Sequence, residues 1–218
     1  MGSVVSSMTE RQVKKTQKVI VFGASAGGID AIRQVLSQLP ADLPAATLVV
    51  QHLRPDSQTR LPEYLAKYCR MQVCLAEDGL LVKTGVVYVA VPGQHLRVGN
   101  GRLTLSSEEK ENYVRPSIDV LFASAAQAFG PDVIGVVLTG TGRDGAHGCQ
   151  IIKANGGTTI AQDRATSRQF AMPKAAIDAG AIDYVLPVEQ IPGQIMTLIQ
   201  NTEISEHGDM GMEGTIGQ

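Results

Sequence analysis

The chain of 218 residues lacks the features that mark secreted, membrane-spanning or nucleic-acid-binding proteins. Its three cysteines, Cys69, Cys74 and Cys149, are an odd number without CxxC spacing, which is typical of reduced thiols rather than of disulfides or a zinc site. The net charge of −2 gives no general attraction to nucleic acid or to a membrane surface. No secretory leader opens the chain, and no apolar run reaches the roughly 18 residues that span a bilayer. These absences predict a cytoplasmic protein without nucleic-acid binding or membrane insertion.

What the chain has is an alternation of short apolar runs and amphipathic stretches. The runs are rich in Val, Ile or Leu and are flanked by Gly, Pro or polar residues, so we predict strands at 18–23, 46–51, 71–76, 86–91, 132–138, 157–161 and 182–186. Stretches with a period of 3.6 residues between the runs predict helices. The alternation indicates an α/β fold with a doubly wound, mainly parallel sheet and helices on both faces.

Three further segments complete the predicted organisation. Residues 95–106 alternate with period two around an Asn-Gly pair, which predicts an antiparallel hairpin appended to the sheet. Residues 1–17 and 201–218 are polar and without periodicity, so we expect both to be disordered. One domain, 18–200, remains.

A turn of small residues follows the first apolar run. Residues 19–30 read VIVFGASAGGID, so Ser25 lies between an expected strand and an expected helix. The G-x-S-x-G pattern is typical of a nucleophile elbow, which exposes a serine hydroxyl and directs backbone N–H groups at a developing oxyanion. A dinucleotide-binding loop or a serine that only caps the helix fits the same turn, and the motif alone leaves the three readings open.

The second apolar run favours the nucleophile. It ends in Gln51-His52, with no acidic residue to hold a ribose, and no tyrosine of the chain has a lysine four residues on, as a short-chain dehydrogenase requires. A histidine here is the base that a serine nucleophile needs. Asp144, after a very apolar run, is the expected orienting acid, with Asp163 as a rival acid and His147 as a rival base.

Together these segments resemble the catalytic domain of CheB-type chemotaxis protein-glutamate methylesterases. The similar stretches span about residues 18–200 and are VIVFGASAGGIDAI, VVQHL, VYVAVPGQHL, RPSIDVLF, LTGTGRDGAHG and FAMPKAA. The resemblance implies a Ser-His-Asp esterase with Ser25 as nucleophile, His52 as base and Asp144 as orienting acid. It implies hydrolysis of glutamate γ-methyl esters on methyl-accepting chemoreceptor helices, with glutamine deamidation as a related activity, and no cofactor or metal.

The resemblance also predicts the surroundings of the site. Ala26 stands where the family often has threonine, and Thr141 stands where it commonly has methionine. We expect both residues at the oxyanion site through their backbone N–H groups. Arg115 and Met172 are expected around the substrate pocket. No receiver domain precedes the catalytic segment, so we expect the chain to act alone or under a separate response regulator. An NAD(P)-binding oxidoreductase and a non-catalytic signalling module of the same fold are the alternative function classes.

The arginines that follow strands are a last sequence signal. In a doubly wound sheet, the residues after the strands gather at one edge, where ligands bind. Arg54, Arg60, Arg143, Arg164 and Arg168 all follow predicted strands. We therefore expect a positive rim on the same edge as Ser25.

Overall fold

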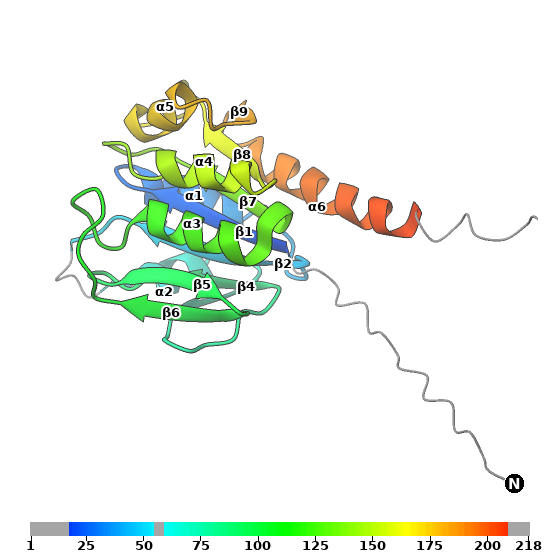
Figure 1. Cartoon of the computed structure of the whole chain (residues 1–218), viewed down its shortest axis with the longest axis horizontal. Coiled ribbons are helices and arrows are strands. Elements are labelled where there is room, and N and C mark those ends of the chain that lie inside the picture. The colour runs from blue at the N-terminus through cyan, green and yellow to red at the C-terminus, as the bar shows by residue number, and fades with distance from the viewer. Residues whose placement is uncertain (1–17, 55–58, 209–218) are drawn as a thin grey trace, which may run out of the picture.

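Figure 1 shows the computed structural model, which describes residues 18–54 and 59–208, with side chains as far as Gln200. Seven parallel strands form the central sheet in the order β3-β4-β2-β1-β7-β8-β9. Their bounds are β1 (Lys18–Ala24), β2 (Ala45–Gln51), β3 (Gln72–Leu75), β4 (Val86–Val89), β7 (Val133–Val137), β8 (Thr158–Gln162) and β9 (Tyr184–Leu186). The predicted mainly parallel sheet is confirmed.

Helices cover both faces of this sheet. They are α1 (Gly28–Leu36), α2 (Leu61–Ala66), α3 (Ile118–Phe129), α4 (Ala146–Ala154), α5 (Ala171–Asp178) and α6 (Ile191–Gly208), with a short 3₁₀ turn, η1 (Gly130–Asp132). Alternate residues of β1 belong to two separate cores: Val19 and Val21 pack with α3, α4 and α5, and Ile20 and Phe22 pack with α1, α2 and α6. The central strands β1, β2, β4 and β7 are therefore buried on both faces, which explains their nearly continuous apolar sequences, whereas the edge strands β3 and β9 are largely exposed.

The predicted hairpin is present as a sheet of its own. Strands β5 (His95–Gly99) and β6 (Arg102–Ser106) pair antiparallel and do not join the central sheet. Leu96, Val98 and Leu103 are buried in the core that contains α3, and the Val98 N–H donates to Ser124 Oγ of that helix at 3.1 Å. The hairpin therefore covers α3 rather than extending the sheet.

The C-terminal helix runs past the predicted domain boundary at residue 200. Helix α6 continues to Gly208, because no proline or glycine interrupts residues 194–207. Of the segments predicted to be disordered, residues 1–17 and residues 209–218 lie outside the described part of the chain. Among the helices that the structure describes, none has the length and apolarity needed to cross a membrane.

The sheet order sets the position of the site. Strand β1 lies between β2 on one side and β7 on the other. The chain builds the β2, β3 and β4 side of the sheet first and then returns to the opposite side of β1 with β7, so the strand order reverses at β1. In open α/β sheets, ligands bind in the crevice at such a reversal, outside the carboxyl ends of the strands. The segments after β1, β2 and β7 carry Ser25, His52 and Asp144.

Candidate active site

The serine turn is held from both sides. The Ser25 N–H donates to Thr139 O after β7 at 3.0 Å, and the Gln51 Nε2 donates to Ser25 O at 2.8 Å. Gly27 has a φ of 81°, a left-handed conformation that glycine adopts without steric cost and that lets the chain enter α1 directly. Close backbone packing thus fixes a half-buried serine at the carboxyl end of β1.

His52 lies next to this turn at the end of β2. Its backbone N–H donates to Ala24 O at 2.9 Å, which continues the β1–β2 pairing by one residue. Its side-chain Nε2 lies 2.8 Å from Asp144 Oδ2. In the part of the chain that the structure describes, the Ser25 hydroxyl makes no hydrogen bond to His52, and catalytic hydrogen bonds are often long in proteins without substrate.

Asp144 is the most densely hydrogen-bonded carboxylate of the site. Its side chain is buried and accepts hydrogen bonds from His52 Nε2, from the backbone N–H groups of Ile118 (2.7 Å) and Asp119 (3.1 Å), and from two side chains, Ser117 Oγ (2.8 Å) and Asn112 Nδ2 (3.1 Å). The two backbone donors belong to the N-terminus of α3, where the helix dipole favours a negative charge. Burial alone would raise the pKa of Asp144, but these hydrogen bonds, led by that of His52, outweigh it and hold the pKa below its ordinary 3.8.

A second buried carboxylate mirrors the first. Asp119 of α3 accepts from the backbone N–H groups of Gly145 (2.9 Å) and Gly148 (2.6 Å), at the N-terminus of α4. Each of the two helix N-termini thus binds a carboxylate from the segment of the other helix. Burial, together with the nearby charge of Asp144, raises the pKa of Asp119 above 3.8.

Asn112 joins the two carboxylates. Its Nδ2 donates to Asp119 Oδ2 at 2.7 Å and to Asp144 Oδ1 at 3.1 Å. Asn112 and Asp119 are site residues that the sequence reasoning missed. Asp119 lies within the RPSID stretch that carries the resemblance, which was a usable signal, whereas nothing in the pattern around Asn112 indicated that it reaches Asp144.

The rival residues are engaged elsewhere. Asp163 accepts hydrogen bonds from the N–H and hydroxyl of Thr166 three residues on, as in a local turn. His147 is an exposed residue of α4 whose Nδ1 lies 3.4 Å from Gln150 Oε1. The geometry therefore favours Asp144 over Asp163 as the carboxylate that faces His52.

A family model described as CheB methylesterase matches residues 20–195. The chain belongs to the CheB methylesterase family. It is 45% identical over 181 residues to "Protein-glutamate methylesterase/protein-glutamine glutaminase 2" of Anaeromyxobacter dehalogenans, an alignment that covers 83% of this chain and 53% of that protein. It is 42% identical over 191 residues to "Protein-glutamate methylesterase/protein-glutamine glutaminase" of Archaeoglobus fulgidus, covering 85% of this chain and 55% of that one.

The fold agrees with a solved structure of this CheB family. The Thermotoga maritima CheB methylesterase catalytic domain superposes with a TM-score of 0.80 at 39% identity, over 85% of this chain and 98% of that one. The chain spans about half the length of the two curated relatives named above. It corresponds to their catalytic part, as the match to the Thermotoga catalytic domain indicates.

The predicted oxyanion residues of this CheB-family chain lie in two loops, one after β1 and one after β7. Ala26 and Thr141 are both exposed. Among the described residues, neither backbone N–H is paired with an acceptor, whereas the N–H of Gly140, the residue before Thr141, donates to Gln169 O at 2.8 Å. Their roles stay predictions, and the two free donors are compatible with them.

Of the two residues expected around the substrate pocket, Met172 is buried and Arg115 binds backbone carbonyls of a neighbouring loop. The Met172 side chain is fully buried, and its sulfur would lie 2.2 Å from a Cβ added at Gly140, so it packs against the glycine that also adjoins Ser25. Arg115 Nη1 donates to Ser107 O at 2.6 Å and to Glu108 O at 2.5 Å. A contact of either residue with substrate stays a prediction, and Met172 offers no exposed surface for one in this structure.

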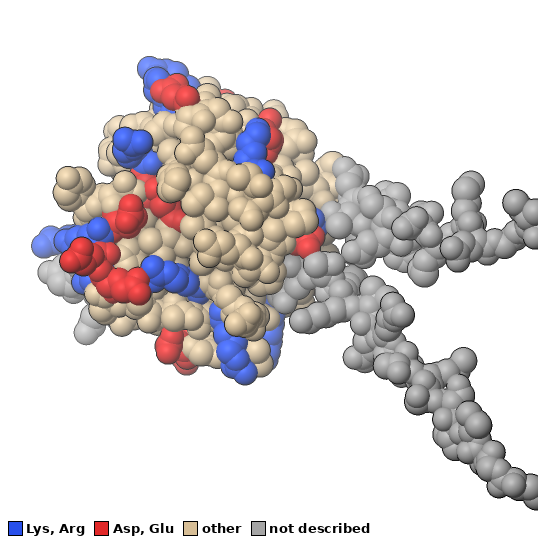
Figure 2. Space-filling view, viewed as in Figure 1, with Lys and Arg blue, Asp and Glu red and all other residues tan. Residues whose placement is uncertain are grey.

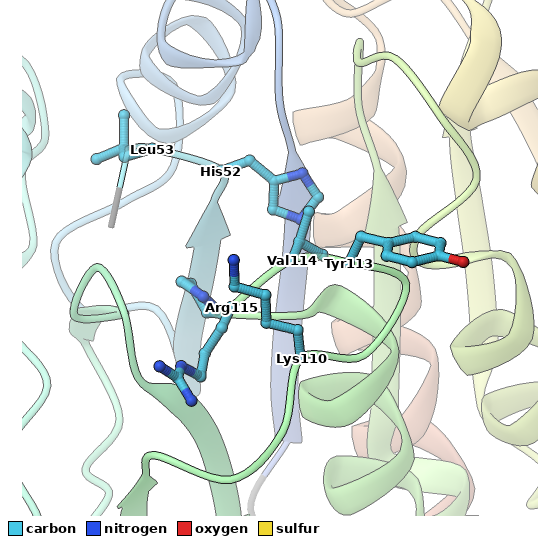
Figure 3. Close-up of a pocket in the computed structure, with 7 residues that line it drawn as sticks. His52, Leu53, Lys110, Tyr113, Val114 and Arg115 are labelled. Atoms are coloured by element: carbon cyan, nitrogen blue, oxygen red, sulfur yellow. The ribbon is translucent and has the colours of Figure 1, made fainter. Parts of the chain in front are cut away.

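Two hollows open beside the site. The first, of about 190 Å³, is lined by His52 and Leu53 and by Lys110 and residues 113–116 of the segment between β6 and α3, as Figure 3 shows. The second, of about 440 Å³, contains Arg164, Arg168 and Phe170, with Arg164 stacked on the Phe170 ring at 5.8 Å. Arg168 packs against the serine turn, since its Cβ would lie 2.8 Å from a Cβ added at Gly27.

Part of the predicted positive rim is therefore beside the serine. Arg164 and Arg168 are exposed, and among the residues that the structure describes, no carboxylate lies within ion-pair distance of either. The rim is not uniformly positive. In Figure 2, acidic and basic side chains alternate on the left of the molecule, the side where the β6–α3 segment lies in Figure 1.

Proposed function

We propose that the chain hydrolyses γ-methyl esters of glutamate side chains on chemoreceptor proteins, with Ser25 as nucleophile, His52 as general base and Asp144 as the orienting acid. The observation that carries the proposal is the 2.8 Å hydrogen bond between His52 Nε2 and the buried Asp144 carboxylate, at the sheet edge that holds Ser25. The names of the relatives, methylesterase and glutaminase, support the same substrate class. The proposal places the chain in the cytoplasm with the receptor domain as its partner.

The geometry supports a defined distribution of protons. The ionised Asp144 only accepts hydrogen bonds, so His52 carries its proton on Nε2, and Nδ1 keeps a lone pair. In the proposed mechanism, Nδ1 takes the hydroxyl proton of Ser25 as Oγ attacks the ester carbonyl. The resulting imidazolium is stabilised by the carboxylate, which remains ionised throughout.

After the attack, His52 changes from general base to general acid. The tetrahedral oxyanion accepts hydrogen bonds from the Ala26 and Thr141 N–H groups and lies near the positive end of α1. The imidazolium returns its proton to the departing methoxide, so methanol leaves and Ser25 carries the glutamyl acyl group. Water then attacks the carbonyl of this acyl-enzyme with His52 as base again. The imidazolium returns the proton to Ser25 Oγ as the C–Oγ bond breaks, and the glutamate carboxylate leaves. Replacing methoxide by ammonia as leaving group gives glutamine deamidation by the same steps.

A nucleotide site is less well supported. The side chain at the carboxyl end of β2 in a dinucleotide site should be acidic, to hold a ribose, but here the last residue of the strand is Gln51, whose amide donates to Ser25 O and His52 O. The proposed chemistry uses protein groups alone, without a metal or organic cofactor. A non-catalytic module of the same fold remains the alternative that experiment must exclude.

Methanol release from a methylated receptor fragment tests the proposal. We expect release by the wild-type protein and its loss in Ser25→Ala, by a factor on the order of 10⁶ as for the nucleophile of another serine hydrolase. Ser37→Ala is the matched control, because Ser37 Oγ only donates to Gln34 O at the end of α1. A fluorophosphonate should label Ser25, as read by mass spectrometry. Wild-type activity in Ser25→Ala would remove Ser25 from the mechanism.

A further inference from the structure

A strained turn lies beside the candidate site. The Val114 N–H donates to Glu111 O at 3.0 Å, and the two residues between them, Asn112 and Tyr113, have φ values of 50° and 66°. Positive φ at both central positions of a hydrogen-bonded turn defines type I′, which prefers Asn-Gly. Asparagine tolerates the left-handed region, but a bulky aromatic residue there is a genuine outlier. The chain thus has tyrosine where glycine fits without strain.

The side chain of Tyr113 is almost fully exposed. Its side chain is 96% exposed, more than any other large hydrophobic side chain in the described part of the chain. It therefore buries almost no apolar surface that offsets the strained backbone. Strained residues without a packing reason concentrate at sites of function, where the surrounding structure holds them in place.

The rest of the turn is anchored while the ring is free. The Asn112 side chain binds both Asp119 and Asp144, which fixes the turn to the triad acid. Two residues further on, Arg115 Nη1 binds the carbonyls of Ser107 and Glu108 and ties the two ends of the segment together. Tyr113 borders the hollow that His52 also lines, and in Figure 3 its ring points outward from the loop. An aromatic ring on a fixed stem beside the base is well placed to contact whatever brings an ester to His52.

We propose that Tyr113 is a specificity-determining residue that binds the polypeptide of the protein substrate outside the ester group. This inference rests on the proposed function and deepens it. Tyrosine is suited to such a contact because it offers a large amphipathic surface at little cost in side-chain entropy. The partner chemistry is an apolar side chain of the substrate next to the modified glutamate. A small ester, which lacks that neighbour, does not use Tyr113.

The experiment compares two substrates and three variants. Tyr113→Gly removes the ring and the strain, and Tyr113→Asn removes the ring but keeps a residue that tolerates left-handed φ. Asn100→Gly is the control, because Asn100 also has a positive φ, 49°, and lies in the distant β5–β6 turn. The measurements are kcat/KM on a methylated receptor fragment, kcat/KM on N-acetylglutamate γ-methyl ester, and the urea midpoint of unfolding.

We expect both Tyr113 variants to lose about tenfold or more in kcat/KM on the receptor fragment, as for an aromatic contact residue, and to stay within about twofold on the small ester. The urea midpoint of Tyr113→Gly should be equal to or above that of the wild type. Asn100→Gly should change neither rate. Equal losses on both substrates would overturn the inference, because Tyr113 would then act on the triad itself. An unchanged receptor rate would overturn it as well. A wild-type protein inactive on both esters would refute the proposed function and this inference with it.

Discussion

Replacing Asp144 with asparagine tests how far the candidate acid also supports the fold. The two carboxylate oxygens accept five hydrogen bonds: Oδ2 from His52 and Ile118, and Oδ1 from three further donors. Asparagine has nearly the same shape but replaces one of these oxygens by an NH₂ group. In either orientation, at least two donors then face a donor.

The magnitude follows from that count. A hydrogen bond to a charged group contributes roughly 1.5–3 kcal/mol, and a charge at a helix N-terminus up to about 2 kcal/mol when partly buried. Part of this loss is offset, because removing the charge relieves the repulsion that helps to raise the pKa of Asp119. We therefore expect Asp144→Asn to lower the free energy of unfolding by about 3–5 kcal/mol. Turnover should fall by up to roughly 10⁴, because an amide donor favours the wrong histidine tautomer.

Urea denaturation followed by circular dichroism measures the first effect, and hydrolysis of a small glutamate methyl ester measures the second. Asp163→Asn is the matched control, since the Asp163 carboxylate accepts hydrogen bonds only from Thr166 in the described part of the chain and Asp163 lies after the neighbouring strand β8. It should stay within about 1 kcal/mol and twofold of the wild type. An unfolding free energy of Asp144→Asn within about 1 kcal/mol of the wild type, or a larger rate loss in Asp163→Asn, would refute this reasoning.

Three further predictions concern the neighbours of the site. Gly140→Ala should lower the unfolding free energy by about 1–3 kcal/mol and reduce turnover, because its Cβ would lie 2.8 Å from Ser25 Cβ; unchanged turnover would show that the serine position is not critical. Burial raises the pKa of Asp119, so the folded state holds this proton more tightly than the unfolded chain, and stability is lost as the pH rises from 3.8 through the folded pKa. Asp119→Asn should therefore flatten the pH dependence of the unfolding free energy, measured by urea titrations between about pH 4 and 7. An unchanged slope would argue against a raised pKa. Finally, kcat/KM on the receptor fragment should fall as salt shortens the Debye length from about 10 Å at 0.1 M to 3 Å at 1 M, and replacing Arg164 and Arg168 together with glutamine should reduce that fall; the same salt response with a small neutral ester would exclude steering by the two arginines.

The sheet and the candidate triad could be predicted because both depend on local sequence signals. Strands buried on both faces read as apolar runs, and the residues that follow parallel strands must meet at one edge. Ser25, His52 and Asp144 each follow such a run, so their proximity needed no knowledge of side-chain geometry. The CheB family resemblance then ordered their roles.

The remaining features depend on long-range packing that no local pattern encodes. Asn112 contacts Asp144 across 32 residues only because a turn with two positive φ values brings its amide there. The period-two pattern predicted the antiparallel hairpin and its place beside the sheet, but it gave no sign that the pair would form a separate two-stranded sheet packed on α3. The place of Met172 in the substrate pocket stays a prediction, and its full burial against Gly140 depends on how α5 packs on the loop after β7, which no local pattern shows.

Because the N-termini of α3 and α4 each bind a carboxylate, an aspartate kept for the fold has to be distinguished from residues kept for the activity when sequences are compared. Asp144 satisfies the N-terminus of α3 whether or not a substrate is ever cleaved. A descendant of this chain that lost its activity would still be under pressure to keep Asp144, while Ser25 and His52 would be free to change. An aspartate at this position in a distant relative is therefore evidence for an intact fold, and only the serine and the histidine together are evidence for a working esterase.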